Sequence, residues 1–263
     1  MLLRVENLSV AYPVRGQAPF VAVNDISFEV DAGQSFGIVG ESGCGKTSMA
    51  KALMGLHPPS AGRMLFDGRD VIEMNDSQFK QYRRAVQMIF QDAVGSLNPR
   101  MTVQQMLEEV LRVHRMRPAD QIQRRVAELV DRVGLAADVL HAYPREISGG
   151  QCQRVSIARC LALEPRMIIA DEPVSALDVS VQARILNLIR TLQTELNLAV
   201  ILISHDLAVV RNICDRVAVM YQGQFVETGG ASEVMDHPQH AYTKTLLAAV
   251  PDVVRALHTR TTT

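Results

Sequence analysis

The stretch GESGCGKT, Gly40 to Thr47, decides the fold that we expect for this chain. Gly40 and Gly45 allow a tight bend in which successive backbone N–H groups point inward, and the dipole of a following helix adds positive potential. A loop of this kind binds an anion. Lys46 would reach the outer phosphates of a nucleotide, and the hydroxyl of Thr47 would ligate Mg²⁺. The alternative is a glycine-rich turn that only caps a helix.

The sequence around this loop favours the phosphate interpretation. Residues Ser35–Val39, SFGIV, are a short apolar run typical of a buried strand, and Lys46–Met54 reads as a helix that stops near Gly55. A strand, a glycine loop and a helix in this order are the context that a phosphate-binding loop requires. We therefore predict a nucleotide site at the end of this strand.

The composition fits a large globular domain. With 263 residues, 48% of them hydrophobic, the chain can bury a large core as one domain or as a domain with an insertion. Its 27 Lys and Arg against 28 Asp and Glu give a formal net charge of -1, so no overall basic field attracts nucleic acid. The four cysteines are scattered singly, which indicates reduced thiols in a cytoplasm. No run approaches the roughly 18 apolar residues of a membrane span, so work at a membrane would need another chain to cross it.

Apolar patterns predict the other elements. Between residues 92 and 161, strand-like alternation gives way to helical spacing, which predicts an inserted helical subdomain. A helix with an apolar stripe is expected between two buried parallel strands, and its stripe is Ile185, Leu188, Ile189, Leu192 and Leu196. The expected strands are residues 2–11, 20–30, 35–39, 167–170, 199–204, 216–221 and 224–228.

Polar residues follow the predicted buried strands, at the edge where α/β sheets place their ligands. Asp171 and Glu172 follow MIIA; Asp171 is expected on the Mg²⁺ side, and Glu172 could polarise a water against the terminal phosphate. His205 follows AVILIS and could contact that phosphate. Gln91 ends the strand-like VQMIFQ, so its amide could touch Mg²⁺ or water. Each residue taken alone would be an ordinary polar residue at the end of a strand or at the start of a loop.

A second turn in the helical insert also has the chemistry of an anion site. ISGGQCQR, Ile147 to Arg154, places a serine and two glycines at the start of a helix, which offers a hydroxyl and N–H groups to an anion. The alternative is an N-cap made by Ser148, which holds in either case. The cap alone does not explain why a chain with one complete nucleotide site carries a second phosphate-binding turn.

Six motifs together resemble the ATP-binding-cassette ATPases, in order and approximate spacing, from Leu2 to about Thr228. They are GESGCGKT, Gln91, ISGGQ, MIIADE, SALD (Ser175 to Asp178) and His205. The resemblance implies an α/β fold: a P-loop NTPase (RecA-like) core with an N-terminal antiparallel β subdomain and an inserted α-helical subdomain at about 92–161. This ATPase domain would occupy residues 1–228, followed by a tail at 229–263. ATP and Mg²⁺ are the implied ligands.

The resemblance also implies roles for individual residues. In the family, two cassettes pair head to tail, so each ATP lies between the phosphate loop of one chain and the SGGQ turn of the other. The implied catalytic residues are Lys46, Gln91, Glu172 and His205. The implied metal ligands are Thr47, Gln91 and Asp171. The nucleotide would contact Tyr12, which matches the aromatic that stacks on adenine, together with Gly40, Glu41, Ser42, Gly43, Cys44, Gly45, Lys46, Thr47, Ser48, Ser148, Gly149, Gly150, Gln151 and Asp178.

Within the family, the chain resembles the subgroup that powers import of peptides, nickel and related small solutes. The resemblance rests on three stretches: FQDAVGSLNPRMTV (Phe90 to Val103), DEPVSALDVSVQA (Asp171 to Ala183) and HPQHAYTKTLLAAVP (His237 to Pro251). It implies a peripheral subunit at the cytoplasmic face of the inner membrane. The implied partners are a second cassette, permease subunits touched by residues 93–102 and, indirectly, an extracytoplasmic solute-binding protein, with no nucleic acid.

Two departures leave the transported solute open. Ile147 stands where leucine is usual in the SGGQ motif, and the chain stops at Thr263, where many relatives continue into a segment with clustered cysteines. Two other functions also stay open. One is an accessory ATPase of a soluble complex, such as phosphonate degradation, which shares much of the tail pattern. The other is a DNA-repair cassette, although the chain has no long heptad insert and no basic stripe.

Overall fold

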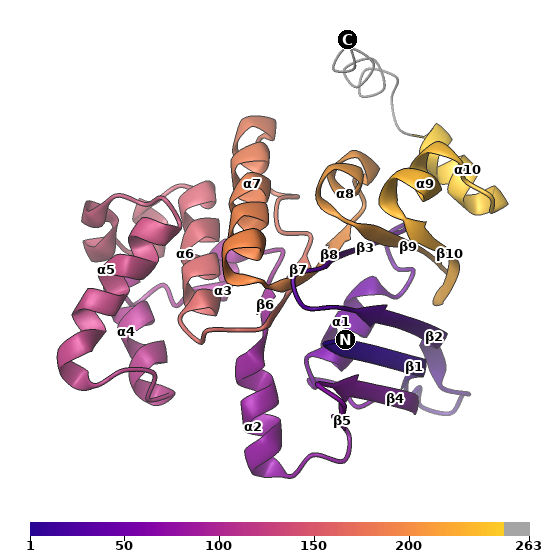
Figure 1. Cartoon of the computed structure of the whole chain (residues 1–263), viewed down its shortest axis with the longest axis horizontal. Coiled ribbons are helices and arrows are strands. Elements are labelled where there is room, and N and C mark those ends of the chain that lie inside the picture. The colour runs from indigo at the N-terminus through magenta and orange to yellow at the C-terminus, as the bar shows by residue number, and fades with distance from the viewer. Residues whose placement is uncertain (250–263) are drawn as a thin grey trace. The chain divides into compact units, whose positions relative to one another are not determined.

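A computed structural model of the chain describes residues 1–249. The last part of the predicted tail, including the end of the HPQHAYTKTLLAAVP stretch, lies outside the described residues. The chain divides into two compact units, whose elements are labelled in Figure 1. Among the described residues, the first unit is residues 1–74 with residues 200–249, and the second unit is residues 75–199. No helix in the described part is long and apolar enough to cross a bilayer.

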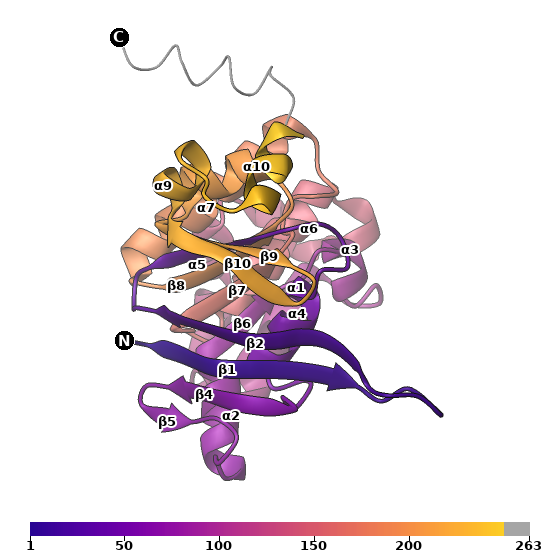
Figure 2. The same ribbon diagram turned by 90° about the vertical axis from the view of Figure 1, so that its right-hand side faces the viewer.

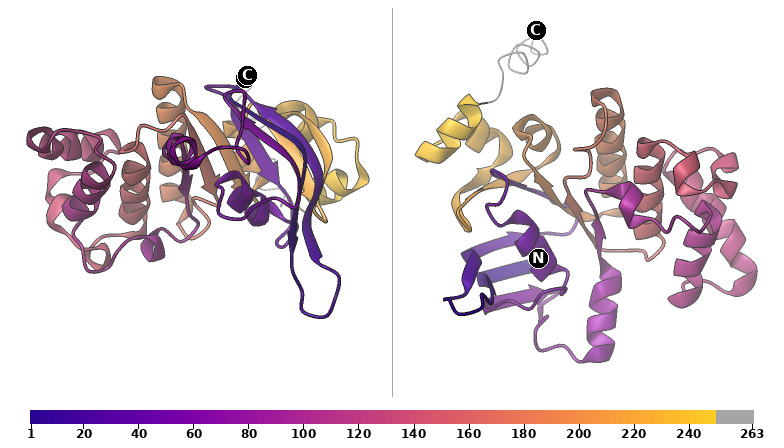
Figure 3. Two further views of the ribbon diagram at one scale, coloured as in Figure 1. Left: turned by 90° about the horizontal axis from the view of Figure 1, so that it is seen from below. Right: turned by 180° about the vertical axis from the view of Figure 1, so that it is seen from behind.

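The first unit contains an antiparallel sheet with the strand order β2-β1-β4-β5 (Figure 2). A loop of residues 13–19 joins β1 to β2 at one end of this sheet (Figure 3). Leu3 and Val5 are buried, and so are Leu8 and Val10, because successive side chains of a strand point to opposite faces; a register shift between Val5 and Leu8 interrupts the alternation. The strands span Leu3–Tyr12 (β1), Phe20–Val30 (β2), Ala61–Phe66 (β4) and Arg69–Asp70 (β5).

A second set of strands in the same unit surrounds β3, whose five residues are all buried. β3 pairs in parallel with β8 on one side and with β9 on the other, and β10 pairs antiparallel with β9. Continuous apolar runs suit β3 and β8 because parallel strands are covered on both faces. The elements are Ser35–Val39 (β3), Ala199–Ser204 (β8), Arg216–Tyr221 (β9), Gln224–Gly230 (β10), Lys46–Leu53 (α1), Leu207–Ile213 (α8), Ala231–Asp236 (α9) and Ala241–Ala248 (α10).

The second unit is mostly helical. Two parallel strands, β6 and β7, pair along their length, and from residue 93 to residue 161 the chain forms helices and 3₁₀ turns without a strand. The strands are Val86–Ile89 (β6) and Met167–Asp171 (β7). The α-helices are Asp76–Ala85 (α2), Ala93–Ser96 (α3), Val103–Val113 (α4), Ile122–Arg132 (α5), Gly149–Leu161 (α6) and Val179–Leu196 (α7). The 3₁₀ turns are Ala119–Gln121 (η1), Ala137–His141 (η2) and Pro144–Glu146 (η3).

Most predicted strands are confirmed, four of them with the same bounds: β2, β3, β8 and β9. Two details of the predicted elements were wrong, one in a strand and one in a helix. VQMIFQ is not a strand up to Gln91, because β6 ends at Ile89, where its pairing with Ala170 of β7 ends. The apolar stripe of α7 includes Leu186 and does not include Leu196, which is 37% exposed in the last turn of the helix.

Candidate nucleotide site

The glycine loop follows β3, and its last two residues, Lys46 and Thr47, begin α1. Gly45 precedes the helix with φ 113°, a conformation that side-chain-bearing residues rarely adopt. A Cβ atom at Gly45 would lie 2.3 Å from the carbonyl oxygen of Ala22, and one at Gly40 would lie 2.2 Å from the carbonyl oxygen of Met220. Glycine is therefore required at both positions, because neighbouring backbone occupies the space that a side chain needs.

Lys46 lies inside this loop. Its side chain is buried, and Nζ donates to the carbonyl oxygens of Gly40 (2.7 Å) and Glu41 (2.8 Å), with the Cys44 sulfur at 3.7 Å. The first turn of α1 contains no acidic residue, so nothing there neutralises the positive end of the helix dipole. A buried ammonium group beside a helix N-terminus has the chemistry that a phosphate chain needs. Thr47 and Ser48 follow in the same turn, and Thr47 is an exposed residue.

Tyr12 and His205 lie in the same unit as the loop. Tyr12 ends β1, and its ring stacks on the ring of His57 with centroids 4.5 Å apart. His205 directly follows β8 and is exposed, in a turn fixed by Asp206, whose carboxylate accepts from the amides of Ala208 (2.9 Å) and Val209. His57 was not predicted, because nothing in the sequence around it signals a contact with a strand end 45 positions away.

Three predicted residues lie in the second unit near the end of β7. Asp171, the last residue of β7, is buried with 7% exposure. Glu172 follows it with φ 46°, a left-handed conformation that turns the chain sharply after the strand. The side-chain amide of Gln91 donates to the Glu172 carboxylate over 3.1 Å, so two of the predicted residues meet directly. This contact orients the Glu172 carboxylate at the end of β7.

The SGGQ turn forms the start of α6. Ser148 is the N-cap: its hydroxyl accepts from the amide of Gln151, and the Gln151 side chain accepts from the amide of Ser148 at 2.8 Å. The expected helix cap is confirmed. Gly149 and Gly150 are the first two residues of the helix, where backbone N–H groups have no partner within the helix. A Cβ at Gly150 would lie 2.6 Å from Val181 of α7.

Asp178 is the N-cap of α7. Its carboxylate accepts from the amide of Val181 (3.0 Å) and from the hydroxyl of Ser180 (2.8 Å). The hydrogen bond from the Ser180 hydroxyl, and to a smaller extent the one from the Val181 amide, lowers the pKa of this exposed carboxyl group. Asp178 is therefore ionised at neutral pH and available on the surface.

Each unit, taken by itself, carries donors of the kind that ATP and Mg²⁺ bind. The first unit supplies a glycine loop with a buried ammonium group, and the hydroxyl of Thr47. The second unit supplies the carboxylate of Asp171 and the amide oxygen of Gln91. Hydroxyl, carboxylate and amide oxygens are the hard ligands that Mg²⁺ prefers, usually with only one or two carboxylates.

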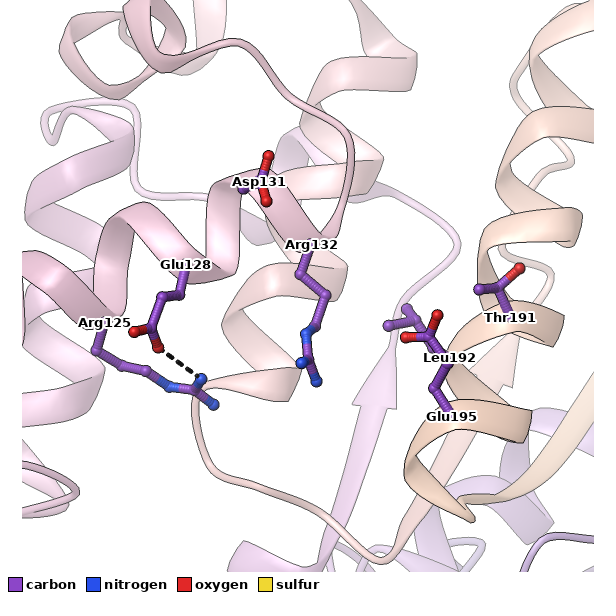
Figure 4. Close-up of a pocket in the computed structure, with 7 residues that line it drawn as sticks. All are labelled: Arg125, Glu128, Asp131, Arg132, Thr191, Leu192 and Glu195. Atoms are coloured by element: carbon purple, nitrogen blue, oxygen red, sulfur yellow. Dashed lines mark hydrogen bonds and ion pairs between the residues drawn. The ribbon is translucent and has the colours of Figure 1, made fainter.

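The second unit also has a groove between α5 and α7, with a volume of about 370 Å³ (Figure 4). On its α5 wall, Arg125 and Glu128 form an ion pair at 3.3 Å, and Arg132 also points into the opening. None of the predicted site residues lines this groove. The lining residues are Arg125, Glu128, Asp131, Arg132, Thr191, Leu192 and Glu195.

Comparisons with known proteins agree on one family. The family model for ABC transporters matches residues 23–175. The oligopeptide transport ATP-binding protein OppF of Haemophilus influenzae is 45% identical over 260 residues, which cover 95% of this chain and 78% of that protein. The oligopeptide transport ATP-binding protein AppF of Bacillus subtilis is 48% identical over 231 residues, which cover 88% of this chain and 70% of that protein.

Solved structures agree as well. A dimeric ATP-binding cassette in a post-hydrolysis state, bound to ADP and Pi, superposes with a TM-score of 0.78 at 26% identity, covering 88% of this chain and 99% of the other. The cbiO1 protein of Clostridium perfringens, part of the ABC transporter complex cbiONQ, superposes with a TM-score of 0.79 at 27% identity, covering 98% of both chains. The predicted P-loop NTPase fold is confirmed by these likenesses. The chain belongs to the ABC transporter family.

Proposed function

We propose that this chain is the ATP-hydrolysing subunit of an importer, and that it energises uptake of peptides or a related small solute through a separate permease. The observation that carries the proposal is the 45% identity, over 95% of the chain, to an oligopeptide transport ATP-binding protein. The relatives OppF and AppF named above are transport ATP-binding proteins, and this favours a transporter subunit over an accessory ATPase of a soluble complex.

In this proposal, the phosphate chain of ATP lies on the glycine loop, where the Lys46 ammonium exchanges its carbonyl partners for phosphate oxygens. Tyr12 packs against adenine, and His205 binds the terminal phosphate. Thr47, Gln91 and Asp171 hold Mg²⁺, which when bound neutralises charge on the phosphates and acts as a Lewis acid.

Glu172 is the proposed base that takes a proton from the attacking water. Its carboxylate already accepts a hydrogen bond from Gln91 at 3.1 Å, so its orientation is fixed before the substrate arrives. Fixed orientation reduces the reorganisation that proton transfer requires. Gln91 would thereby connect the metal to the base.

A second cassette completes the proposed site. Ser148, Gly149, Gly150 and Gln151 would bind the terminal phosphate of the ATP on the partner, and Asp178 would lie at the same interface. Residues 93–102 would touch the permease, and an extracytoplasmic binding protein would deliver the solute. The subunit would lie at the cytoplasmic face of the inner membrane. The proposed ATPase domain is residues 1–228, with a helical insert at about 92–161 and a tail from 229.

The hydrolytic part of the proposal is tested with Glu172→Gln. This change keeps the shape of the side chain and removes the base, so ATP should still bind while turnover falls by about 100-fold or more. Glu195→Gln is the matched control, because Glu195 is an exposed glutamate in the α5–α7 groove. Near-normal turnover of Glu172→Gln in the assembled complex would remove Glu172 from this role.

The transport part is tested by affinity purification of the tagged chain from detergent-solubilised membranes. Mass spectrometry of the co-purifying chains should identify permease subunits with membrane-spanning segments. Recovery of the chain only in a soluble complex without such subunits would contradict the importer.

A further inference from the structure

The two residues that precede α10, the last helix of the described residues, are attached to strand β10. The amides of Gln239 and His240 donate to the two carboxylate oxygens of Glu227 on β10, at 2.7 and 3.0 Å. The ring of His240 then accepts from the amide of Tyr242 at 3.2 Å and caps the helix. Two hydrogen bonds therefore attach the start of α10 to β10, and the third, the local cap, places Tyr242 in the first turn of the helix.

Tyr242 contacts the phosphate loop directly. Its half-buried ring packs against the ring of Tyr221, the last residue of β9, with centroids 4.2 Å apart. Its hydroxyl oxygen accepts a hydrogen bond from the amide of Glu41, at 3.2 Å. This bond joins residues 201 positions apart in the sequence. The aromatic pair leaves the hydroxyl little freedom to move away from the loop.

The Glu41 backbone is also part of the support of Lys46. The carbonyl oxygen of Glu41 accepts from Nζ of Lys46 at 2.8 Å and from the amide of Cys44 at 3.3 Å. At the far end of the loop, the carbonyl oxygen of Cys44 accepts from the amide of Gly223 at 2.9 Å. The hairpin thus holds the end of the loop, and Tyr242 holds its beginning.

We propose that Tyr242 is a positioning residue of the nucleotide site: its hydroxyl fixes residue Glu41, and thereby the shape of the loop that receives the phosphates. The inference rests on the proposed function and adds the helix α10 to the ATP site. Tyr242 does not touch the reacting atoms in this proposal. Its loss should therefore weaken ATP binding and leave the chemical step unchanged.

The test is Tyr242→Phe in the full chain, which keeps the ring pair and removes only the acceptor. A hydrogen bond of this kind is worth enough to change an affinity by about 3- to 10-fold. We expect the dissociation constant for Mg-ATP, and the KM for ATP in the assembled transporter, to rise by about that factor. The kcat should stay within about twofold of the wild type.

Tyr221→Phe is the matched control, because the described bond of the Tyr221 hydroxyl is to Gln222 and not to the loop. An unchanged or lower dissociation constant in Tyr242→Phe would overturn the inference. So would a fall in kcat without a change in KM, or an equal rise in KM in Tyr221→Phe. A wild-type chain that does not bind Mg-ATP would overturn both the proposed function and this inference. Normal binding by both the wild type and Tyr242→Phe would overturn the inference alone.

Discussion

Replacing Gly45 with alanine tests the geometry of the phosphate loop, and Gly43→Ala is a control within the same loop. Both glycines have positive φ, 113° at Gly45 and 81° at Gly43. They differ in the space around them. A Cβ at Gly45 meets the Ala22 carbonyl oxygen at 2.3 Å and the end of Met220 at 2.8 Å, whereas a Cβ at Gly43 meets nothing within 4 Å.

The expected cost of each substitution has two contributions. A non-glycine residue held at positive φ costs about 1–3 kcal/mol, and this strain applies to both variants. At Gly45 the Met220 side chain can move aside, but the Ala22 carbonyl belongs to β2, so the strand or the loop must shift. Overpacking of this kind costs about 1–3 kcal/mol more. In a protein of this size the difference corresponds to a melting temperature about 2–12 °C lower for Gly45→Ala than for Gly43→Ala.

The assay is thermal unfolding followed by circular dichroism without nucleotide, with Mg-ATP binding measured on the same samples. Gly45→Ala should also bind Mg-ATP more weakly than Gly43→Ala, because the displaced loop no longer directs its amides at one point. Equal melting temperatures for the two variants would refute the reasoning, since the steric contact is the feature that separates them most clearly.

Two further predictions concern the second unit. Gly149→Asp should leave monomer stability and ATP binding intact but abolish ATP-dependent pairing measured by size-exclusion chromatography, because a Cβ there meets only Leu177 at 3.4 Å while the carboxylate would repel the phosphate of the partner. Loss of binding by the monomer would instead assign the turn to its own chain. Burial raises the pKa of the Cys160 thiol from 9.0 to about 12, so the folded chain keeps a proton that the unfolded chain loses above pH 9.0. The free energy of unfolding should therefore fall by about 1.4 kcal/mol per pH unit between these values. Cys160→Ala should remove this contribution to the pH dependence of the free energy of unfolding, measured by denaturant titrations at several pH values. An unchanged pH dependence in the variant would contradict the assignment to Cys160.

The buried strands were predictable because their signal is local. SFGIV and AVILIS are uninterrupted apolar runs bounded by turns, and every residue of β3 and β8 is buried. Helix α2 was missed because it buries only Tyr82 and so has no apolar stripe. Its sequence did contain a start signal, since Asn75 and Gln78 form a capping box.

The candidate site also contains parts that the sequence predicts and contacts that it does not predict. The glycine loop, the acids after β7 and the SGGQ turn are short motifs whose chemistry is visible in a few adjacent residues. The stacking of His57 on Tyr12 and the bond from Glu41 to Tyr242 join distant parts of the chain. No periodicity or spacing predicts such a contact, because it depends on how the tertiary fold brings two elements together.

The pairing of β3 also has a consequence for the order in which the chain can fold as it leaves the ribosome. Residues 75–199 are continuous and can fold as soon as they are made, but β3 waits for β8 and β9, and Ser35 bonds to Asp215, 180 positions later. Closing so long a loop is slow, and an unpaired apolar strand is prone to aggregate while it waits. A ribosome-bound chain therefore completes the support of its nucleotide loop late, once Gly223 and Tyr242 have been made, and we expect chaperones to be needed most during synthesis of residues 40–242.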